Sequence, residues 1–189
     1  MHVDSGVAGL AFSAVSTLVV VVGALAALRQ LRYLRHGNEM HALADFDREF
    51  NSPEMLRDRE FVRTELVEAL KDPSFVAELR SVPAGPRALP VIRVANFFER
   101  IALYAYAGAI SHYVATMRYG SAAIGYWPML RDAIVIVRSS RATPLLEYFE
   151  DFAMRAPEVM ARDKQRRKRP LRRDPTIAQT EEAATPPED

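Results

Sequence analysis

The stretch that decides the fold is residues 7–28, VAGLAFSAVSTLVVVVGALAAL. Residues 5–28 contain no charged side chain, and eleven of the 22 residues of 7–28 are Val, Leu or Phe. As an α-helix this stretch would extend roughly 33 Å, which is enough to cross a bilayer core of about 30 Å. A helix buried in a soluble domain is rarely apolar on every side over such a length. The sequence therefore predicts a transmembrane helix over residues 7–28.

The charges beside this stretch predict its orientation. Asp4 but no Lys or Arg precedes it, whereas Arg29, Arg32 and Arg35 follow it. By the positive-inside rule, the side that carries the arginines faces the cytoplasm and the short N-terminus lies outside. A cleaved signal peptide is the alternative, because residues 24–26 (ALA) have the spacing of a small-residue cleavage site. A signal peptide also needs a basic start, which the chain lacks.

Small residues recur along one face of the predicted transmembrane helix. Gly9, Ser16 and Gly23 are spaced by seven, and Ser13 follows Gly9 by four. This spacing lets two helix backbones approach closely in lipid, which favours self-association. Glycine and serine are also common in membrane spans that do not pair, so both interpretations stand.

Composition and charge divide the chain into residues 1–6, 7–28, 29–157 and 158–189. A hydrophobic fraction of 49% and a mean hydropathy of −0.09 exclude a multi-pass membrane protein and a wholly disordered chain. The absence of cysteine excludes disulfide frameworks and cysteine-based metal sites. Residues 29–157 have the length and periodicity of one all-α cytoplasmic bundle of about five helices.

Capping residues before prolines predict where several of these helices begin. Ser52, Asp72 and Thr143 each precede a proline, so helices are expected to start at Pro53, Pro73 and Pro144. Residues 82–90 hold three prolines and a glycine and predict a loop.

Glycine and proline also predict where helices end or bend. A helix over residues 29–50 is expected to break or kink at Gly37-Asn38. The longest helix is expected over residues 91–119 and to end at Gly120, followed by a helix over 121–140. Pro128 predicts a kink or a fresh start in that helix, and Pro157 is expected to end the last one.

The net charge of +1 hides a strong segregation at the C-terminus. Residues 162–173 contain eight basic residues and one acid, whereas residues 174–189 contain five acids and no base. The absence of periodicity predicts that residues 158–189 are a disordered tail. The basic run either contacts anionic lipid or is simply solvated; the residues that we expect at such a contact are Arg166, Arg167, Lys168 and Arg169. Nucleic acid is not expected as a partner, because no aromatic residues alternate with these bases.

The sequence contains no recognisable catalytic or cofactor motif. Phosphate-binding glycine loops, HExxH and GxSxG are all missing. A di-iron bundle would need Glu-x-x-His pairs, and Glu99, Glu147 and Glu150 have no His three residues later. We therefore predict no catalytic residue, metal ligand or cofactor.

Two polar features of the predicted core are candidates for a functional site. The charged pair Glu99-Arg100 lies among apolar residues and needs partners, either in an inter-helix ion pair or in a polar ligand pocket. The other residues that we expect there are Tyr104, Arg131, Arg138, Arg141 and Glu147. Aromatic residues also crowd one region and form either core or an interface rim: Tyr104, Tyr106, Tyr113, Tyr119, Tyr126 and Trp127.

These residues carry a family resemblance. Residues 96–102 (NFFERIA), Tyr126-Trp127 before Leu130-Arg131, Arg138, and residues 148–153 (YFEDFA) resemble a bacterial family known only as a domain of unknown function. The resemblance covers residues 8–156 and implies one N-terminal membrane span followed by a helical cytoplasmic domain. It implies no activity, catalytic residue or cofactor. An excess of Arg over Lys, 22 to 3, also favours a GC-rich bacterial source.

The sequence thus predicts a single-pass protein of the bacterial inner membrane. Its expected function is non-enzymatic: an interaction or scaffold module that contacts the bilayer, a protein partner or a second copy of itself through its helices. The alternative is a membrane-tethered sensor that binds a small ligand or ion between helices around Glu99, Arg100 and Tyr104.

Overall fold

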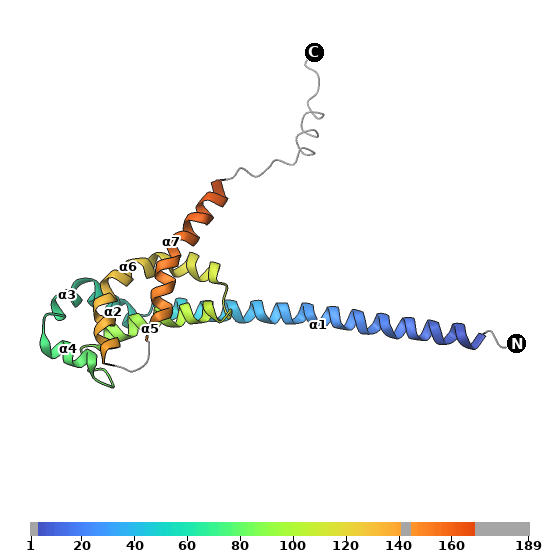
Figure 1. Ribbon diagram of the computed structural model, residues 1–189, viewed down its shortest axis with the longest axis horizontal. Coiled ribbons are helices and arrows are strands. Elements are labelled where there is room, and N and C mark those ends of the chain that lie inside the picture. Colours follow the sequence, from blue (N-terminus) through green and yellow to red (C-terminus); the bar gives the residue numbers. More distant parts are fainter. Residues whose placement is uncertain (1–3, 141–144, 169–189) are drawn as a thin grey trace, which may run out of the picture.

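A computed structural model describes residues 4–140 and 145–168, and within them it contains helices and no strand. The helices are α1 (Asp4–Phe50), α2 (Pro53–Thr64), α3 (Leu66–Ala69), α4 (Pro73–Arg80), α5 (Leu89–Tyr106), α6 (His112–Ser139) and α7 (Glu147–Lys168). In Figure 1, α1 is a long rod whose C-terminal end is built into a compact body formed by the other helices, and α7 projects from that body away from the axis of α1. The predicted all-α class is confirmed.

Helix α1 continues without interruption for 47 residues, a length of about 70 Å. The predicted break at Gly37-Asn38 is wrong, because an exposed helical glycine costs only about 1 kcal/mol relative to alanine and does not by itself end a helix. The side chains of residues 4–16, 18–19, 31–32 and 35–36 lie outside the description. The predicted roles of Gly9, Ser13, Ser16, Arg32 and Arg35 therefore concern side chains that are not described. In the part of the chain that is described, no helix is both long enough and apolar enough to cross a membrane.

The capping signals at the starts of α2 and α4 are confirmed. The Ser52 hydroxyl accepts a hydrogen bond from the Met55 backbone N–H at 3.2 Å, and the Asp72 carboxylate accepts one from the Ser74 N–H at 2.8 Å. Each capping side chain thereby satisfies one of the backbone donors that a helix start leaves free.

The helix predicted over residues 91–119 is in fact two helices. The chain leaves the helical path after Tyr106, where Gly108 adopts a positive φ of 71°, a conformation that favours glycine. Gly120 does not end a helix but lies buried inside α6, where a Cβ atom would come within 3.3 Å of Ala156 on α7. The structure therefore uses Gly120 for close packing of α6 on α7. Helix α6 also continues through Pro128 to Ser139.

Helix α7 begins and ends later than predicted. It starts at Glu147, whereas the predicted start, Pro144, lies outside the described residues. It continues through Pro157 to Lys168, so the prediction that order ends at residue 157 is wrong for residues 158–168. Ion pairs spaced by four residues support this extension: Arg155 with Asp151, Arg162 with Glu158, and Arg167 with Asp163. The remaining tail, residues 169–189, lies outside the description.

An aromatic core joins the end of α1 to α5, α6 and α7. Phe46 of α1 packs edge-to-face on Phe97 and Tyr119, with ring centroids 6.0 and 6.5 Å apart. Phe98 of α5 stacks on Phe149 of α7 at 5.0 Å. Because Phe97, Phe98 and Phe149 are completely buried and Tyr119 is nearly so, the last turns of α1 are a structural part of the body.

Candidate functional site

The end of α1 is joined to α6 by a polar contact between the half-exposed Asp47 and Arg118 and the buried Tyr119. Asp47 accepts two hydrogen bonds from the Arg118 guanidinium, at 3.0 and 2.9 Å, and one from the Tyr119 hydroxyl at 2.6 Å. The hydrogen bonds from Arg118 hold the pKa of Asp47 below its ordinary value. Burial, together with the Asp47 charge, raises the pKa of Tyr119 above its ordinary value. The carboxylate is therefore ionised and the phenol protonated at neutral pH, which is the pairing that this contact needs.

Glu99 caps helix α7 from a different helix. Its carboxylate accepts the backbone N–H of Phe149 at 2.7 Å and that of Tyr148, the positions where an N-cap side chain would bond. Leu146, the residue before α7, has no polar side chain to do this. Desolvation raises the pKa of Glu99, more than the two N–H groups lower it. Glu99 therefore positions the start of α7.

Arg138 holds the segment that leads into α7. Its guanidinium donates to the carbonyl oxygens of Leu145 and Leu146, at 2.7 and 3.1 Å, and pairs with Glu150 at 2.7 Å. Leu146 has a φ of 62°, an uncommon conformation for a residue with a side chain. Arg138 and Glu99 thus stabilise an otherwise strained turn.

The predicted polar site is divided between two faces of α5. Arg138 lies near Glu99, and the charge of Glu147 contributes to the raised pKa of Glu99. Arg100 instead pairs with Glu49 of α1, and the Tyr104 ring packs on Phe46 at 5.4 Å. Arg131 is exposed, and Arg141 lies outside the described residues. The six described residues of the predicted site therefore do not form one pocket.

Arg100 and Tyr104 line a hollow between α5 and residues 38–49 of α1, which we call the foot of α1. The hollow has a volume of about 400 Å³ and is open to solvent. Its lining is mixed polar and apolar: Asn38, His41, Ala42, Asp45, Phe46, Glu49, Arg100 and Tyr104. A neighbouring hollow of about 320 Å³ shares Glu49 and Arg100 and continues toward α2.

A buried ion pair between α2 and α5 was missed by sequence reasoning. Asp58 is 4% exposed and receives two hydrogen bonds from Arg93, at 2.6 and 2.8 Å. Arg93 also pairs with Glu54 at 2.7 Å. A signal was present, because Asp58 lies three residues after Met55 and four before Val62, on the buried face of α2.

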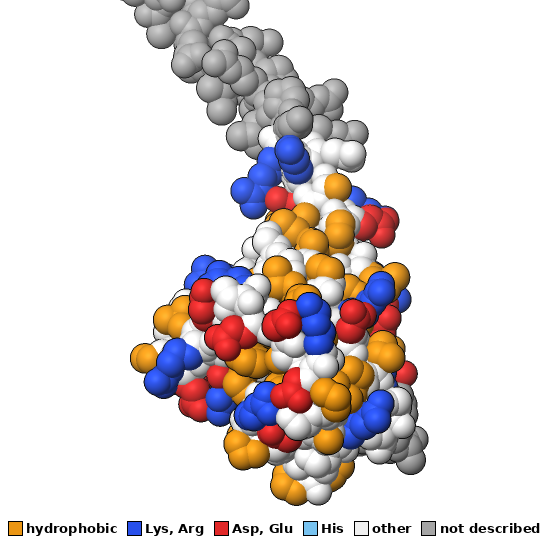
Figure 2. All heavy atoms as spheres, turned by 90° about the vertical axis from the view of Figure 1, so that its left-hand side faces the viewer, with side chains coloured by type: hydrophobic (Ala, Val, Ile, Leu, Met, Phe, Trp, Pro, Cys, Tyr) orange, Lys and Arg blue, Asp and Glu red, His pale blue; other side chains and the backbone are white. Residues whose placement is uncertain are grey.

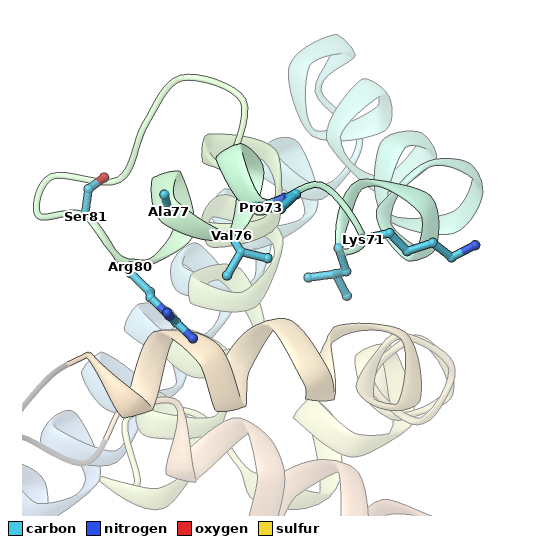
Figure 3. A pocket seen from close by; sticks show the side chains of 7 residues that line it. Lys71, Pro73, Val76, Ala77, Arg80 and Ser81 are labelled. Carbon is cyan, nitrogen blue, oxygen red and sulfur yellow. The ribbon is translucent and has the colours of Figure 1, made fainter.

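Another hollow lies beside α4, at the far end of the body from the free end of α1. It measures about 540 Å³ and is lined by Leu70, Lys71, Pro73, Val76, Ala77, Arg80 and Ser81. Figure 3 shows Arg80 pointing from α4 toward α6, while Lys71 points away. The face of the body that includes this end carries interspersed acidic and basic side chains (Figure 2). We find no charged constellation there that resembles a catalytic site.

A fourth hollow, of about 530 Å³, lies between the start of α6 and the end of α7. It is lined by Met117, Met160, Ala161, Asp163, Lys164 and Arg167. Of the residues predicted to contact anionic lipid, Arg166 and Arg167 are exposed on α7, whereas the Lys168 side chain and Arg169 lie outside the description.

The crowded aromatic residues separate into two groups. Tyr119 and Tyr126 are buried in the core, whereas Tyr104, Tyr106 and Tyr113 are more than 40% exposed. Trp127 lies between, with its ring 5.3 Å from Phe149. The core role is thus confirmed for Tyr119 and Tyr126, whereas the interface role stays a prediction for the exposed tyrosines.

Comparison with known proteins identifies the family of the chain but no function. Among the described residues, no group of three or more His, Cys, Asp or Glu is placed to hold a metal ion. Neither the curated proteins nor the solved structures yield a match. A family model matches residues 17–156, close to the range of the resemblance found in the sequence. The chain belongs to the family described as "Domain of unknown function (DUF4760)".

Proposed function

We propose that this chain is a non-enzymatic interaction or scaffold module of a bacterial cell membrane. Its apolar N-terminal helix anchors it, and its helical domain lies in the cytoplasm. One observation carries the proposal: the apolar residues before Arg29 and the core residues Leu43 and Phe46 belong to the same unbroken helix, α1. A tether of this kind presents a domain at a defined height above a membrane.

The exposure of α1 supports the anchor. Every described side chain from Val20 to Gln30 is exposed, including Leu25 at 61%. Apolar area in water is unfavourable by about 25 cal/mol per Å², so a wholly apolar, unpartnered helix needs apolar surroundings. The family match begins at residue 17, so the junction between the apolar segment and Arg29 lies inside the shared region. The arginine excess of the sequence supports a bacterial source.

The use of the charged residues supports interaction over catalysis. Asp47, Asp58, Glu99 and Arg138 all bond to groups that hold helices together. The surface, in contrast, carries a tyrosine pair, Tyr106 and Tyr148, whose ring centroids are 5.3 Å apart. Tyrosines are enriched at the centres of protein interfaces.

Cysteine labelling tests the anchor and its orientation. Because the natural chain has no cysteine, Ser5→Cys and Gln165→Cys each create a single reactive thiol. In intact bacterial cells, a membrane-impermeant maleimide should label the Ser5→Cys chain, and the Gln165→Cys chain should react only after lysis. Release of the chain from membranes by alkaline carbonate, or labelling of both variants only after lysis, would contradict the anchored topology.

Site-specific crosslinking tests the interaction. A photoreactive amino acid at Tyr106 should give one defined adduct in cells, whereas the same group at Val67, 69% exposed on α3, serves as the control. The mass of the adduct distinguishes a second copy of the chain from another protein. An identical smear from both positions, or no adduct from Tyr106, would count against this surface as the interface.

A sensor is the second candidate, favoured by the hollow at the foot of α1. Its lining includes His41, Asp45 and Arg100 and joins α1 to α5, so a ligand there would contact the anchor helix and the domain together. A ligand that binds only the folded chain raises the midpoint of thermal unfolding. In a metabolite screen on the full chain, a ligand of this hollow should raise the unfolding midpoint. The same ligand should raise the midpoint of the Arg131→Gln variant but not that of the Arg100→Gln variant.

A further inference from the structure

The basic end of α7 lies at the end of the body from which α1 emerges. Glu39 of α1 accepts the backbone N–H of Ser111 at 2.7 Å, just before α6. Two residues later in the chain, Tyr113 donates to Asp163 of α7 at 2.5 Å. Glu39 follows Arg29 by ten residues, which is about 15 Å along a helix. The start of α6, which contacts the end of α7 through Tyr113, thus lies beside α1 about 15 Å along the helix from Arg29.

The lining of the groove at this end is partly apolar and partly charged. Its apolar residues are Met117 of α6 and Met160 and Ala161 of α7, and its charged residues are Asp163, Lys164 and Arg167 of α7. Methionine side chains adapt to irregular apolar partners. Lipid molecules present the matching chemistry, an anionic headgroup above an acyl chain.

The basic residues at the end of α7 outnumber the ion pairs that they form within the described residues. Arg162 pairs with Glu158, and Arg167 pairs with Asp163 and interacts with Tyr113. Among the described residues, Lys164 and Arg166 form no ion pair, and both are exposed. Figure 2 shows Lys and Arg side chains around the end of α7, where the basic run continues into the tail. The excess over residues 162–173 is seven positive charges.

We propose that the groove between the start of α6 and the end of α7 binds anionic phospholipid of the membrane that holds α1. This inference rests on the proposed anchor. The domain would then touch the membrane at two places, through α1 and through the basic end of α7. Two attachments fix the tilt of the body, so that the same face is always presented to a partner.

The test uses the full chain in lipid vesicles, with an environment-sensitive fluorophore on Gln165→Cys. In vesicles that contain phosphatidylglycerol the emission should shift to the blue and be quenched by spin-labelled lipid. In phosphatidylcholine vesicles it should do neither. The same label on Val82→Cys, in the loop between α4 and α5, is the control and should respond to neither lipid.

A matched pair of charge variants separates this site from general attraction. The first variant replaces Lys164, Arg166 and Arg167 by Gln. Each cation near an anionic membrane strengthens the attraction by a factor of about five. The phosphatidylglycerol content that gives half of the fluorescence response should therefore rise at least about fivefold in this variant. A control variant removes the same charge elsewhere and should leave the response unchanged: Arg57→Gln/Arg80→Gln/Arg131→Gln. High salt should abolish the response.

The outcomes distinguish this inference from the anchor on which it rests. If carbonate extracts the chain from the vesicles, the anchored topology fails and the lipid site with it. If the chain stays inserted but the Gln165→Cys label ignores phosphatidylglycerol, or both charge variants behave alike, only the lipid site is overturned. A label response to a DNA duplex or to inorganic phosphate, with none to anionic vesicles, would also overturn it.

Discussion

Replacing Asp47 by alanine should weaken the joint between α1 and the rest of the domain. The carboxylate takes three hydrogen bonds, and Tyr119, which donates one of them, is only 2% exposed. Without Asp47, the Tyr119 hydroxyl is left with the Leu43 carbonyl at 3.5 Å, a weak contact. An unsatisfied buried donor costs about 1–3 kcal/mol, and a half-exposed ion pair such as that with Arg118 contributes up to about 1. We therefore expect Asp47→Ala to lower the free energy of unfolding by about 1–4 kcal/mol.

The measurement is urea unfolding of the full chain in detergent, followed by the fluorescence of Trp127, the one tryptophan of the chain. Asp45→Ala is the matched control: it removes a carboxylate two residues away whose partner, Arg48, is exposed, and we expect a change within about 0.5 kcal/mol. Combining Asp47→Ala with Tyr119→Phe should recover part of the loss, because the orphaned hydroxyl is then gone. A loss no larger than that of the control, or strict additivity of the two substitutions, would refute the reasoning.

Four further substitutions probe the polar contacts and the helix packing of the domain. Glu99→Gln should abolish the part of the pH dependence of folding stability that comes from Glu99. Burial raises the pKa of Glu99 in the folded chain, so its contribution to stability is complete below the ordinary pKa of 4.5 and is lost as pH rises through the raised pKa. In urea titrations, the stability of the natural chain relative to the variant should therefore fall across that pH range. Asp58→Ala removes two charge-assisted hydrogen bonds but leaves the half-exposed Arg93 paired with Glu54, so it should cost about 1–3 kcal/mol, with faster amide exchange in α2. Gly120→Leu forces α6 away from α7 and should cost about 1–3 kcal/mol, whereas Gly125→Ala, with no atom within 4 Å of the added Cβ, should raise the thermal midpoint through a gain of about 0.5–1 kcal/mol.

Local sequence signals predicted the features whose causes are local. Ser52 and Asp72 cap helices through bonds to residues two or three positions away, so the sequence around each start contains the whole interaction. The all-α class follows from periodicity, which is equally local.

The errors concern residues whose role depends on a distant partner. Gly108 and Gly120 are both glycines that follow apolar helical residues, yet one turns the chain and the other packs against Ala156. Pro157 did not end α7, because pairing and packing on both sides of it support the helix. Neither distinction can be made before the position of α7 on α6 is known.

The candidate site shows the same limit. The sequence correctly indicated that Glu99 needs a partner, but the partner is a pair of backbone N–H groups 49 and 50 residues away. Every residue except proline has a backbone N–H, so residue type does not indicate which of them will be a partner. A search for a charged side chain therefore could not find these donors. Arg100, adjacent in sequence, points to α1 because successive helical residues lie about 100° apart around the axis.

The continuity of α1 has a mechanical consequence for any role at a membrane. Phe46 contacts Phe97 and Tyr104 of α5 and Tyr119 of α6, and Asp47 bonds to α6. A rotation of α1 about its axis would break these contacts unless α5 and α6 moved with it, and close-packed cores resist such shear. Between Arg29 and the first buried residue, Leu43, the helix has no break to absorb the motion. Helix α1 and the domain must therefore turn together, so that a contact that reorients one reorients the other.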